Sequence, residues 1–280
     1  MKYFIIFLLL NGVLIIHELS HAIAMWRNKV EIAEIGLGLP LLPFRLSIKF
    51  RKIRFSVYPL LIGAFVRPAA EDELEKLPFS KQLKIYWSGP FANLLTGLIC
   101  FPIYYFVVFS HYIFSGPHII SPFYVFPIIE LFLIVFIGGI LIYLPFRLKN
   151  AKFRPASFLI PMFGIVIYGL IVWSIASGGL NSLMGPIGAV AELPDMFLTF
   201  ELGFFLVFIV LSVAIGFFNI LPLPPLDGGK IMTAFLKTKG TLPKDIKLLN
   251  FAGTALITAL ICAATIQDIF RLLGKILFHS

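Results

Sequence analysis

The sequence predicts an all-α polytopic membrane protein with about six transmembrane helices and a small membrane-associated β-hairpin between the first two. Composition is the first observation: of 280 residues, 59% are hydrophobic and 13% are charged. Soluble domains average about 45–50% apolar and about 25% charged residues. The second observation is that apolar residues form long runs, which need lipid or protein around them. An ordinary soluble domain and a disordered chain are therefore excluded.

Runs of about 17–25 mostly apolar residues mark the expected spans. They lie near 3–26, 85–110, 125–146, 156–176, 201–223 and 249–272. The first run also resembles a secretory signal peptide. No small-residue cleavage site follows it and the apolar pattern continues to residue 25, so we interpret it as a membrane span.

Lysine and arginine are concentrated in the predicted loops 27–84, 147–155 and 224–248 and are absent from 111–124 and 177–200. Because positively charged loops stay on the cytoplasmic side, we expect both chain termini to face outside. The net charge of +9 then reflects topology and attraction to anionic lipid headgroups. No interleaving of basic and aromatic residues indicates a nucleic-acid partner.

The first span contains the motif His17-Glu18-Leu19-Ser20-His21. In a helix, residues four apart share a face, so the two imidazoles can hold one Zn²⁺ with Glu18 beside them. The carboxylate can take a proton from water at the metal and return it to a leaving amine. So short a motif also arises by chance. An ionised group within a span, however, costs about 2.5–3.5 kcal/mol on the insertion scale and rarely lacks a function.

A catalytic zinc ion needs a third protein ligand, and Asp227 is the acidic residue best placed to be one. It belongs to the segment 219–229, which follows the fifth span and contains three prolines and two glycines. Such a segment cannot form a regular helix. Irregular backbone at membrane depth is tolerated only where protein covers it or where it lines a watery cavity. The alternative is a solvated Asp-Gly turn in a cytoplasmic loop.

These residues resemble the site-2 protease family, the intramembrane zinc metalloproteases. The resemblance implies that His17, His21 and Asp227 bind Zn²⁺ and that Glu18 is the catalytic base. It also implies that Asn219, eight residues before the aspartate, binds the substrate backbone. We expect Pro222 of the same segment to contact substrate as well.

Three further segments carry the resemblance. They are Gly89–Asn93 (GPFAN), Met184–Gly188 (MGPIG) and Tyr58–Val66 (YPLLIGAFV). Asn93 is interpreted either as a substrate contact or as a hydrogen bond between helices. The sequence has no room for the PDZ or CBS domains of other family members, so we expect one membrane protease domain over 1–280. Substrate preferences inferred from those accessory domains do not transfer.

Residues 44–57 alternate between apolar and polar side chains, which is typical of strands. We expect a hairpin that turns near Arg51-Lys52, follows the stretch 36–43, and directs its apolar side chains toward lipid. An edge strand near the zinc can capture an extended substrate segment by strand addition. The alternative is a hairpin that only anchors the protein at the membrane surface.

The sequence therefore predicts a zinc-dependent protease that cleaves within or next to transmembrane segments of single-span membrane proteins, in regulated intramembrane proteolysis. We expect it in a prokaryotic plasma membrane, with the active site and a polar cavity on the cytoplasmic side. One alternative is a divalent-metal transporter, although no internal repeat is found and spans two, three, four and six carry no acid or histidine near their middle. The other is an inactive relative that binds membrane proteins, against which the intact Glu18 argues.

Overall fold

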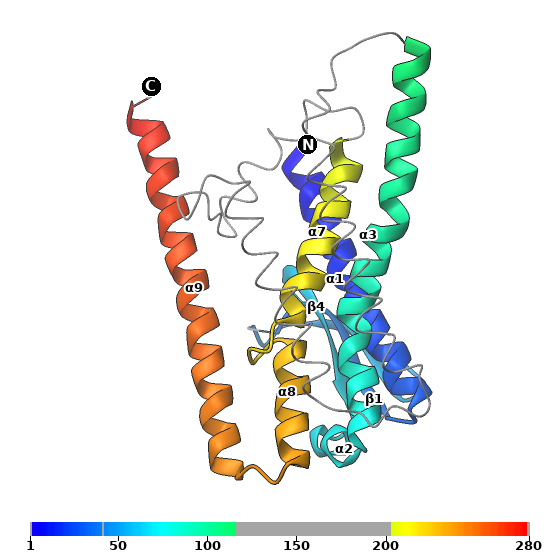
Figure 1. Cartoon of the computed structure of the whole chain (residues 1–280), viewed down its shortest axis with the longest axis vertical. Helices are drawn as coiled ribbons and strands as arrows, with labels where there is room; N and C mark the ends of the chain where they lie inside the picture. Colours follow the sequence, from blue (N-terminus) through cyan, green and yellow to red (C-terminus); the bar gives the residue numbers. More distant parts are fainter. Residues whose placement is uncertain (1, 41, 116–202, 279–280) are drawn as a thin grey trace.

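The computed structural model describes residues 2–40, 42–115 and 203–278, and this part of the chain is mainly helical (Figure 1). The predicted spans 125–146 and 156–176 and the segment Met184–Gly188 lie outside the described residues. The elements in chain order are α1 (Lys2–Arg27), β1 (Ile32–Leu39), β2 (Leu46–Phe50), β3 (Ile53–Val57), β4 (Leu60–Pro68), α2 (Glu71–Lys76), α3 (Phe79–Ser115), α7 (Gly203–Ile220), α8 (Asp227–Thr238) and α9 (Pro243–Phe278).

Four of the described helices, α1, α3, α7 and α9, are long and apolar enough to cross a membrane. They correspond to four of the six predicted spans. Helix α9 begins at Pro243 rather than near 249, because the apolar run marks only the part of a helix suited to lipid. Its first turn carries Asp245, which is favourable near the positive end of the helix dipole.

Helices α1, α3 and α7 pack side by side, and α8 continues below α7 toward the base of α9 (Figure 1). Glycines bring α3 and α7 close together. A Cβ atom on Gly216 would lie 3.0 Å from the Leu94 Cγ and from the Pro90 carbonyl oxygen. Small residues at such a crossing let backbones approach, which is how helices associate without a hydrophobic driving force in lipid.

The strands between α1 and α3 form one four-stranded sheet in the order β2-β3-β1-β4. Strands β2 and β3 are the predicted hairpin, antiparallel and turning at Arg51 and Lys52. Part of the stretch 36–43 before the hairpin belongs to β1, which pairs parallel with β3 and antiparallel with β4. Two glycines obscure its alternation. A Cβ atom on Gly36 would lie 2.3 Å from the Phe65 ring, which would have to move to admit it.

Part of the sheet packs against the first helix. Ile35, Ile53 and Val66 pack against the cluster that contains Ala22 and Met25 of α1. This packing fixes β4 beside the first helix.

The hairpin extends beyond this packed region. Leu46 and Ile48 of β2 remain 80% and 76% exposed, so no described residue covers the apolar surface of the hairpin.

A buried carboxylate joins the strands. Glu34 of β1 is 3% exposed and accepts hydrogen bonds from Ser56, Tyr58 and Arg67. Because a buried charge is tolerated only when it is paired and hydrogen-bonded, this network fixes β3 and β4 around β1.

Replacing Gly216 with leucine is expected to lower stability by about 1–3 kcal/mol, the usual cost of overpacking. The added side chain would force α7 away from α3 at Leu94 and Pro90. Thermal unfolding in detergent measures the effect. The matched control is Gly274→Leu in α9, where a Cβ atom meets nothing within 4 Å. Equal melting temperatures for the two variants would refute this account of the α3–α7 contact.

Candidate metal centre

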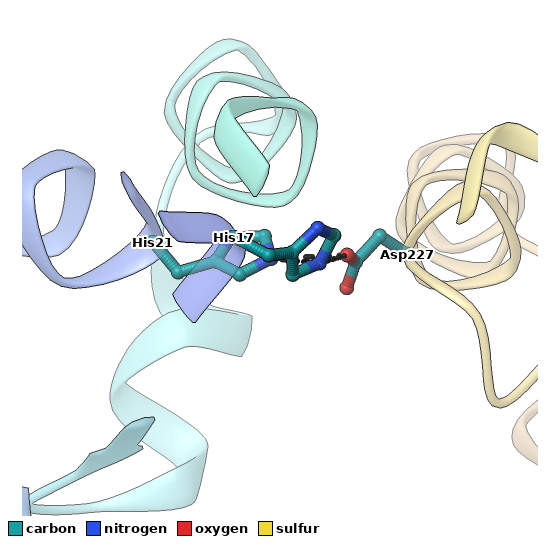
Figure 2. Close-up of side chains that lie close together, drawn as sticks. All are labelled: His17, His21 and Asp227. Atoms are coloured by element: carbon teal, nitrogen blue, oxygen red, sulfur yellow. Dashed lines mark hydrogen bonds and ion pairs between the residues drawn. The ribbon is translucent and has the colours of Figure 1, made fainter. Parts of the chain in front are cut away.

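Three buried side chains from α1 and α8 meet between these helices (Figure 2). The His17 Nε2 lies 2.9 Å from the Asp227 Oδ2, and the His21 Nε2 lies 3.0 Å from the same oxygen. The two Nε2 atoms are 3.2 Å apart. In the part of the chain that the structure describes, this is the only group of three or more His, Cys, Asp or Glu side chains able to hold a metal ion.

Asp227 reaches the histidines because α7 stops at Ile220 and α8 begins at Asp227 itself. Prolines in the connection prevent α7 from continuing. A Cβ atom on Gly228 would lie 2.1 Å from the Ile220 carbonyl oxygen. Only glycine therefore allows the connection to fold back tightly enough to direct Asp227 toward α1.

The other oxygen of the carboxylate is held by a lysine. The Lys230 Nζ donates to the Asp227 Oδ1 at 2.9 Å, one turn further along α8. Burial raises the pKa of the Asp227 carboxyl, but Lys230 and hydrogen bonds from both histidines outweigh burial and hold that pKa well below its ordinary value. The carboxylate is thus kept ionised, which is the form that binds a metal.

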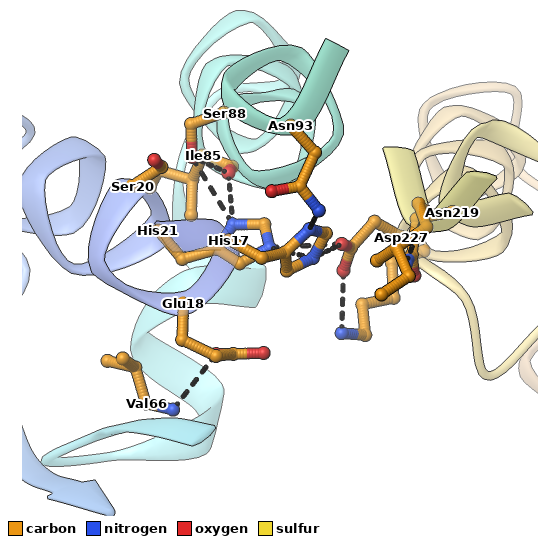
Figure 3. Close-up of polar contacts among 12 residues, drawn as sticks. His17, Glu18, Ser20, His21, Val66, Ile85, Ser88, Asn93, Asn219 and Asp227 are labelled. Atoms are coloured by element: carbon orange, nitrogen blue, oxygen red, sulfur yellow. Dashed lines mark hydrogen bonds and ion pairs between the residues drawn. The ribbon is translucent and has the colours of Figure 1, made fainter. Parts of the chain in front are cut away.

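Helix α3 supplies the surroundings of both imidazoles (Figure 3). The His21 Nδ1 lies 2.7 Å from the Ile85 carbonyl oxygen, and the His17 Nδ1 lies 3.2 Å from the Asn93 Nδ2. Such contacts on the far ring nitrogen orient metal-binding histidines.

The donors fit a zinc ion in chemistry and in space. Two imidazole nitrogens and one carboxylate oxygen are the ligands of many catalytic zinc sites, which keep a fourth position open. A Cβ atom on Gly89 would lie 2.4 Å from the His21 Nε2 and 2.6 Å from the His17 Nε2. The space beside these two nitrogens therefore exists because residue 89 has no side chain.

Glu18 lies beside this group and contacts the sheet. Its Oε2 accepts a hydrogen bond from the Val66 N–H of β4 at 3.1 Å (Figure 3). The side chain is half-buried, so it is less enclosed than the three donors. A carboxylate held next to a metal position, but outside the donor group, is suited to move protons.

The other sequence-predicted residues occupy different surroundings. Asn93 is fully buried and its Nδ2 contacts His17 of α1, as the alternative of a hydrogen bond between helices expects; a substrate contact of Asn93 stays a prediction. Asn219 is half-buried and its Nδ2 donates to the Ile215 carbonyl oxygen within α7. Pro222 is buried in the connection to α8.

Sequence reasoning missed three polar groups of this site. The Ile85 carbonyl and the Val66 N–H belong to the backbone, so no side-chain pattern marks them. The contact of Lys230 was predictable from the sequence, because Asp227 begins a helix and residues three apart on a helix are neighbours.

Gly89→Ala is expected to leave the purified protein with far less than one zinc per chain. Its methyl group would occupy the space beside both Nε2 atoms. Elemental analysis of the purified variant measures the loss. The control is Gly12→Ala in α1, where a Cβ atom would make an ordinary contact at 3.9 Å from the Phe208 ring. Normal zinc content in Gly89→Ala would show that the metal does not lie beside residue 89.

Comparison with known proteins gives relatives of one kind. Zinc metalloprotease RasP of Oceanobacillus iheyensis is 30% identical over 111 residues, which cover 39% of this chain and 26% of that protein. A protein of Borreliella burgdorferi, also named as a zinc metalloprotease, is 27% identical, and the match covers 34% of this chain and 25% of that protein. A zinc metalloprotease of Thermotoga maritima is 32% identical, and the match covers 35% of this chain and 21% of that protein. The chain spans about a quarter of the length of these curated relatives.

The family match extends much further along the chain than these relatives do. The sequence model of Peptidase family M50, the site-2 protease family, matches residues 3–260 and so includes both histidines, Glu18 and Asp227. This protein therefore belongs to Peptidase family M50.

Proposed function

We propose that this protein is an intramembrane zinc endopeptidase that cleaves transmembrane segments of single-span membrane proteins. The observation that carries the proposal is the buried meeting of His17, His21 and Asp227, with two of the three donors on a helix apolar enough to cross a membrane. A soluble zinc protease that merely carries an anchor would have its histidines outside such a helix.

Glu18 acts as the general base and then as the general acid. When bound, the Zn²⁺ ion supplies Lewis acidity, polarising the scissile carbonyl and lowering the pKa of water. Glu18 accepts a proton as the water oxygen adds to the carbonyl carbon, and it returns that proton to the amine nitrogen as the C–N bond breaks. The Val66 N–H holds the carboxylate in position from the sheet.

Water needs a polar route to a site at membrane depth. A cavity of about 270 Å³ borders Lys230, which contacts Asp227. Its polar lining includes Gln82 and Tyr86 of α3 and Asn250 of α9. This cavity supports entry of water near the Asp227 side of the site. We propose that it opens to the cytoplasm of a prokaryotic cell, with both chain termini outside.

The substrate segment binds in extended form along the sheet. A helical segment keeps its carbonyls hydrogen-bonded and shielded, so it must unwind before attack. The sheet order makes β4 an edge strand, and the Val66 N–H points from that edge to Glu18. The edge strand that donates a hydrogen bond to Glu18 is therefore β4, whereas the alternating pattern suggested the hairpin of 44–57 as the substrate edge. Backbone pairing with an edge strand is independent of substrate sequence.

Apolar side chains of the substrate have a complementary surface. A groove of about 320 Å³ lies between α1 and the sheet and is lined by Ile15, Glu18 and Leu19 together with residues of all four strands. A groove that contains the proposed base and is otherwise mainly apolar suits a peptide drawn from a membrane span. Asn219 and Pro222 are proposed to contact this peptide in the substrate complex.

A divalent-metal transporter would require liganding groups along a continuous path. The described residues contain one such group. A catalytically inactive binding protein would not need Glu18 held beside that group. Both features favour the peptidase.

Glu18→Gln is expected to keep about one zinc per chain and to lower the cleavage rate by about 10²–10⁴-fold, the usual contribution of a general acid–base. The amide cannot accept the proton from water. Cleavage of tagged single-span substrates in proteoliposomes and elemental analysis measure the two properties. Asp227→Ala is the companion variant and should lose both. Undiminished cleavage by Glu18→Gln would reject Glu18 as the base.

Strand addition at β4 predicts that backbone N-methylation of a peptide inhibitor weakens binding at alternate positions only. In an antiparallel pair, every second residue of the peptide exchanges hydrogen bonds with the edge strand. Two peptides of one sequence, methylated on even or on odd residues, are matched controls for each other. Inhibition constants for both give the test. Equal inhibition by the two peptides would contradict docking on β4.

A further inference from the structure

The Asn93 side chain has one hydrogen-bond partner among the described residues, and that partner is His17. Asn93 is 0% exposed, its Nδ2 lies 3.2 Å from the His17 Nδ1, and its Oδ1 has no partner. The Ser212 Oγ donates to the Asn93 backbone carbonyl, which fixes the backbone but not the amide. Among the described residues, the contact with His17 is therefore the only hydrogen bond of the Asn93 amide.

The far nitrogen of each imidazole controls what the near nitrogen can bind. A neutral imidazole has a proton on one nitrogen and a lone pair on the other. The His21 Nδ1 faces the Ile85 carbonyl oxygen at 2.7 Å. A carbonyl only accepts, so Nδ1 carries a proton, and in the neutral ring the lone pair is then on the His21 Nε2. This is the tautomer that a metal requires at Nε2.

His17 has the other tautomer when the amide NH₂ faces it. An NH₂ group only donates, so the Nδ1 accepts and the proton lies on Nε2, from which it is donated to the Asp227 Oδ2 at 2.9 Å. That nitrogen then has no lone pair for a metal ion. The two histidines thus differ in what they present, although both point at one carboxylate oxygen.

We propose that Asn93 is the positioning residue that sets the tautomer of His17 for metal binding. With the amide turned over, the Asn93 Oδ1 would accept the proton of the His17 Nδ1 and so leave the Nε2 lone pair of His17 for Zn²⁺. The ring changes tautomer and keeps its net charge. Because the Oδ1 has no other partner, the turn breaks no second hydrogen bond. This inference rests on the metal site of the proposed function.

The spacing on α3 supports this role. Ile85, Gly89 and Asn93 are four residues apart, so they share one helix face. That face gives an acceptor for His21, space beside both Nε2 atoms, and an amide for His17. Asn93 completes a surface that contacts both histidines.

Two substitutions at Asn93 separate positioning from packing. Asn93→Asp keeps an acceptor for the Nδ1 proton, whereas Asn93→Leu keeps the size and removes every polar atom. Zn²⁺ affinity is measured by competition with a chromophoric chelator, and the visible spectrum of the Co²⁺-loaded protein reports the ligand geometry. We expect Asn93→Leu to weaken Zn²⁺ binding by about 10–100-fold, the usual effect of losing an orienting partner, and to alter the Co²⁺ spectrum. Asn93→Asp should retain both properties.

Asn11 of α1 provides the matched control. It is a buried asparagine whose Nδ2 donates to the Phe7 carbonyl oxygen and whose Oδ1 also has no partner, but it does not touch a histidine. Asn11→Leu and Asn11→Asp should leave Zn²⁺ affinity unchanged. The inference is overturned if Asn93→Leu binds Zn²⁺ like the wild type, or if a folded Asn93→Asp loses binding. Failure of the wild-type protein to bind either metal would overturn the proposed function as well.

Discussion

The contact between the Asp227 carboxylate and the two imidazoles of α1 is the constraint on which the structure depends. It joins residues separated by 206 and 210 positions in the chain, and all three side chains are buried. Buried ionisable groups are costly unless they are paired or bind a metal. The surrounding elements therefore either bring these three side chains together or form hydrogen bonds with their other polar atoms.

Helix α3 has the largest supporting role. It lies against both α1 and α7, so its position determines how close the histidines come to the segment that carries Asp227. Gly216 allows the α7 contact and Gly89 leaves space at the histidines. The same helix thus controls both the helix packing and the interior of the site. A displacement of α3 would therefore affect stability and metal binding together.

The sheet connects the site to the proposed substrate. Its packing against Ala22 and Met25 of α1 brings the β4 edge to Glu18, and the Val66 N–H holds the carboxylate there. The buried carboxylate of Glu34 inside the sheet is stabilised by hydrogen bonds from Ser56 of β3 and Arg67 of β4. The hairpin is amphipathic and projects beyond this packed region. One small sheet thus contacts the proposed base, provides the proposed substrate edge and carries the exposed apolar side chains of the hairpin.

Local pattern was enough to predict much of this protein. Apolar runs located four helices that match the described spans, alternation located the β2–β3 hairpin, and spacing identified His17, Glu18 and His21 as a unit. The irregular segment before Asp227 also indicated that this residue lines a site. These features were predictable because helix periodicity, strand alternation and proline geometry act over a few residues.

Only the tertiary structure decided which distant groups meet. It made Ile32–Leu39 a central strand, joined the Val66 N–H of β4 to Glu18, and buried Asn93 against His17. The Ile85 carbonyl and the Val66 N–H carry no side-chain signature, because every residue but proline has these backbone groups. Their roles depend on the direction in which a helix or a strand edge faces after packing, and that direction is set by contacts far apart in the sequence.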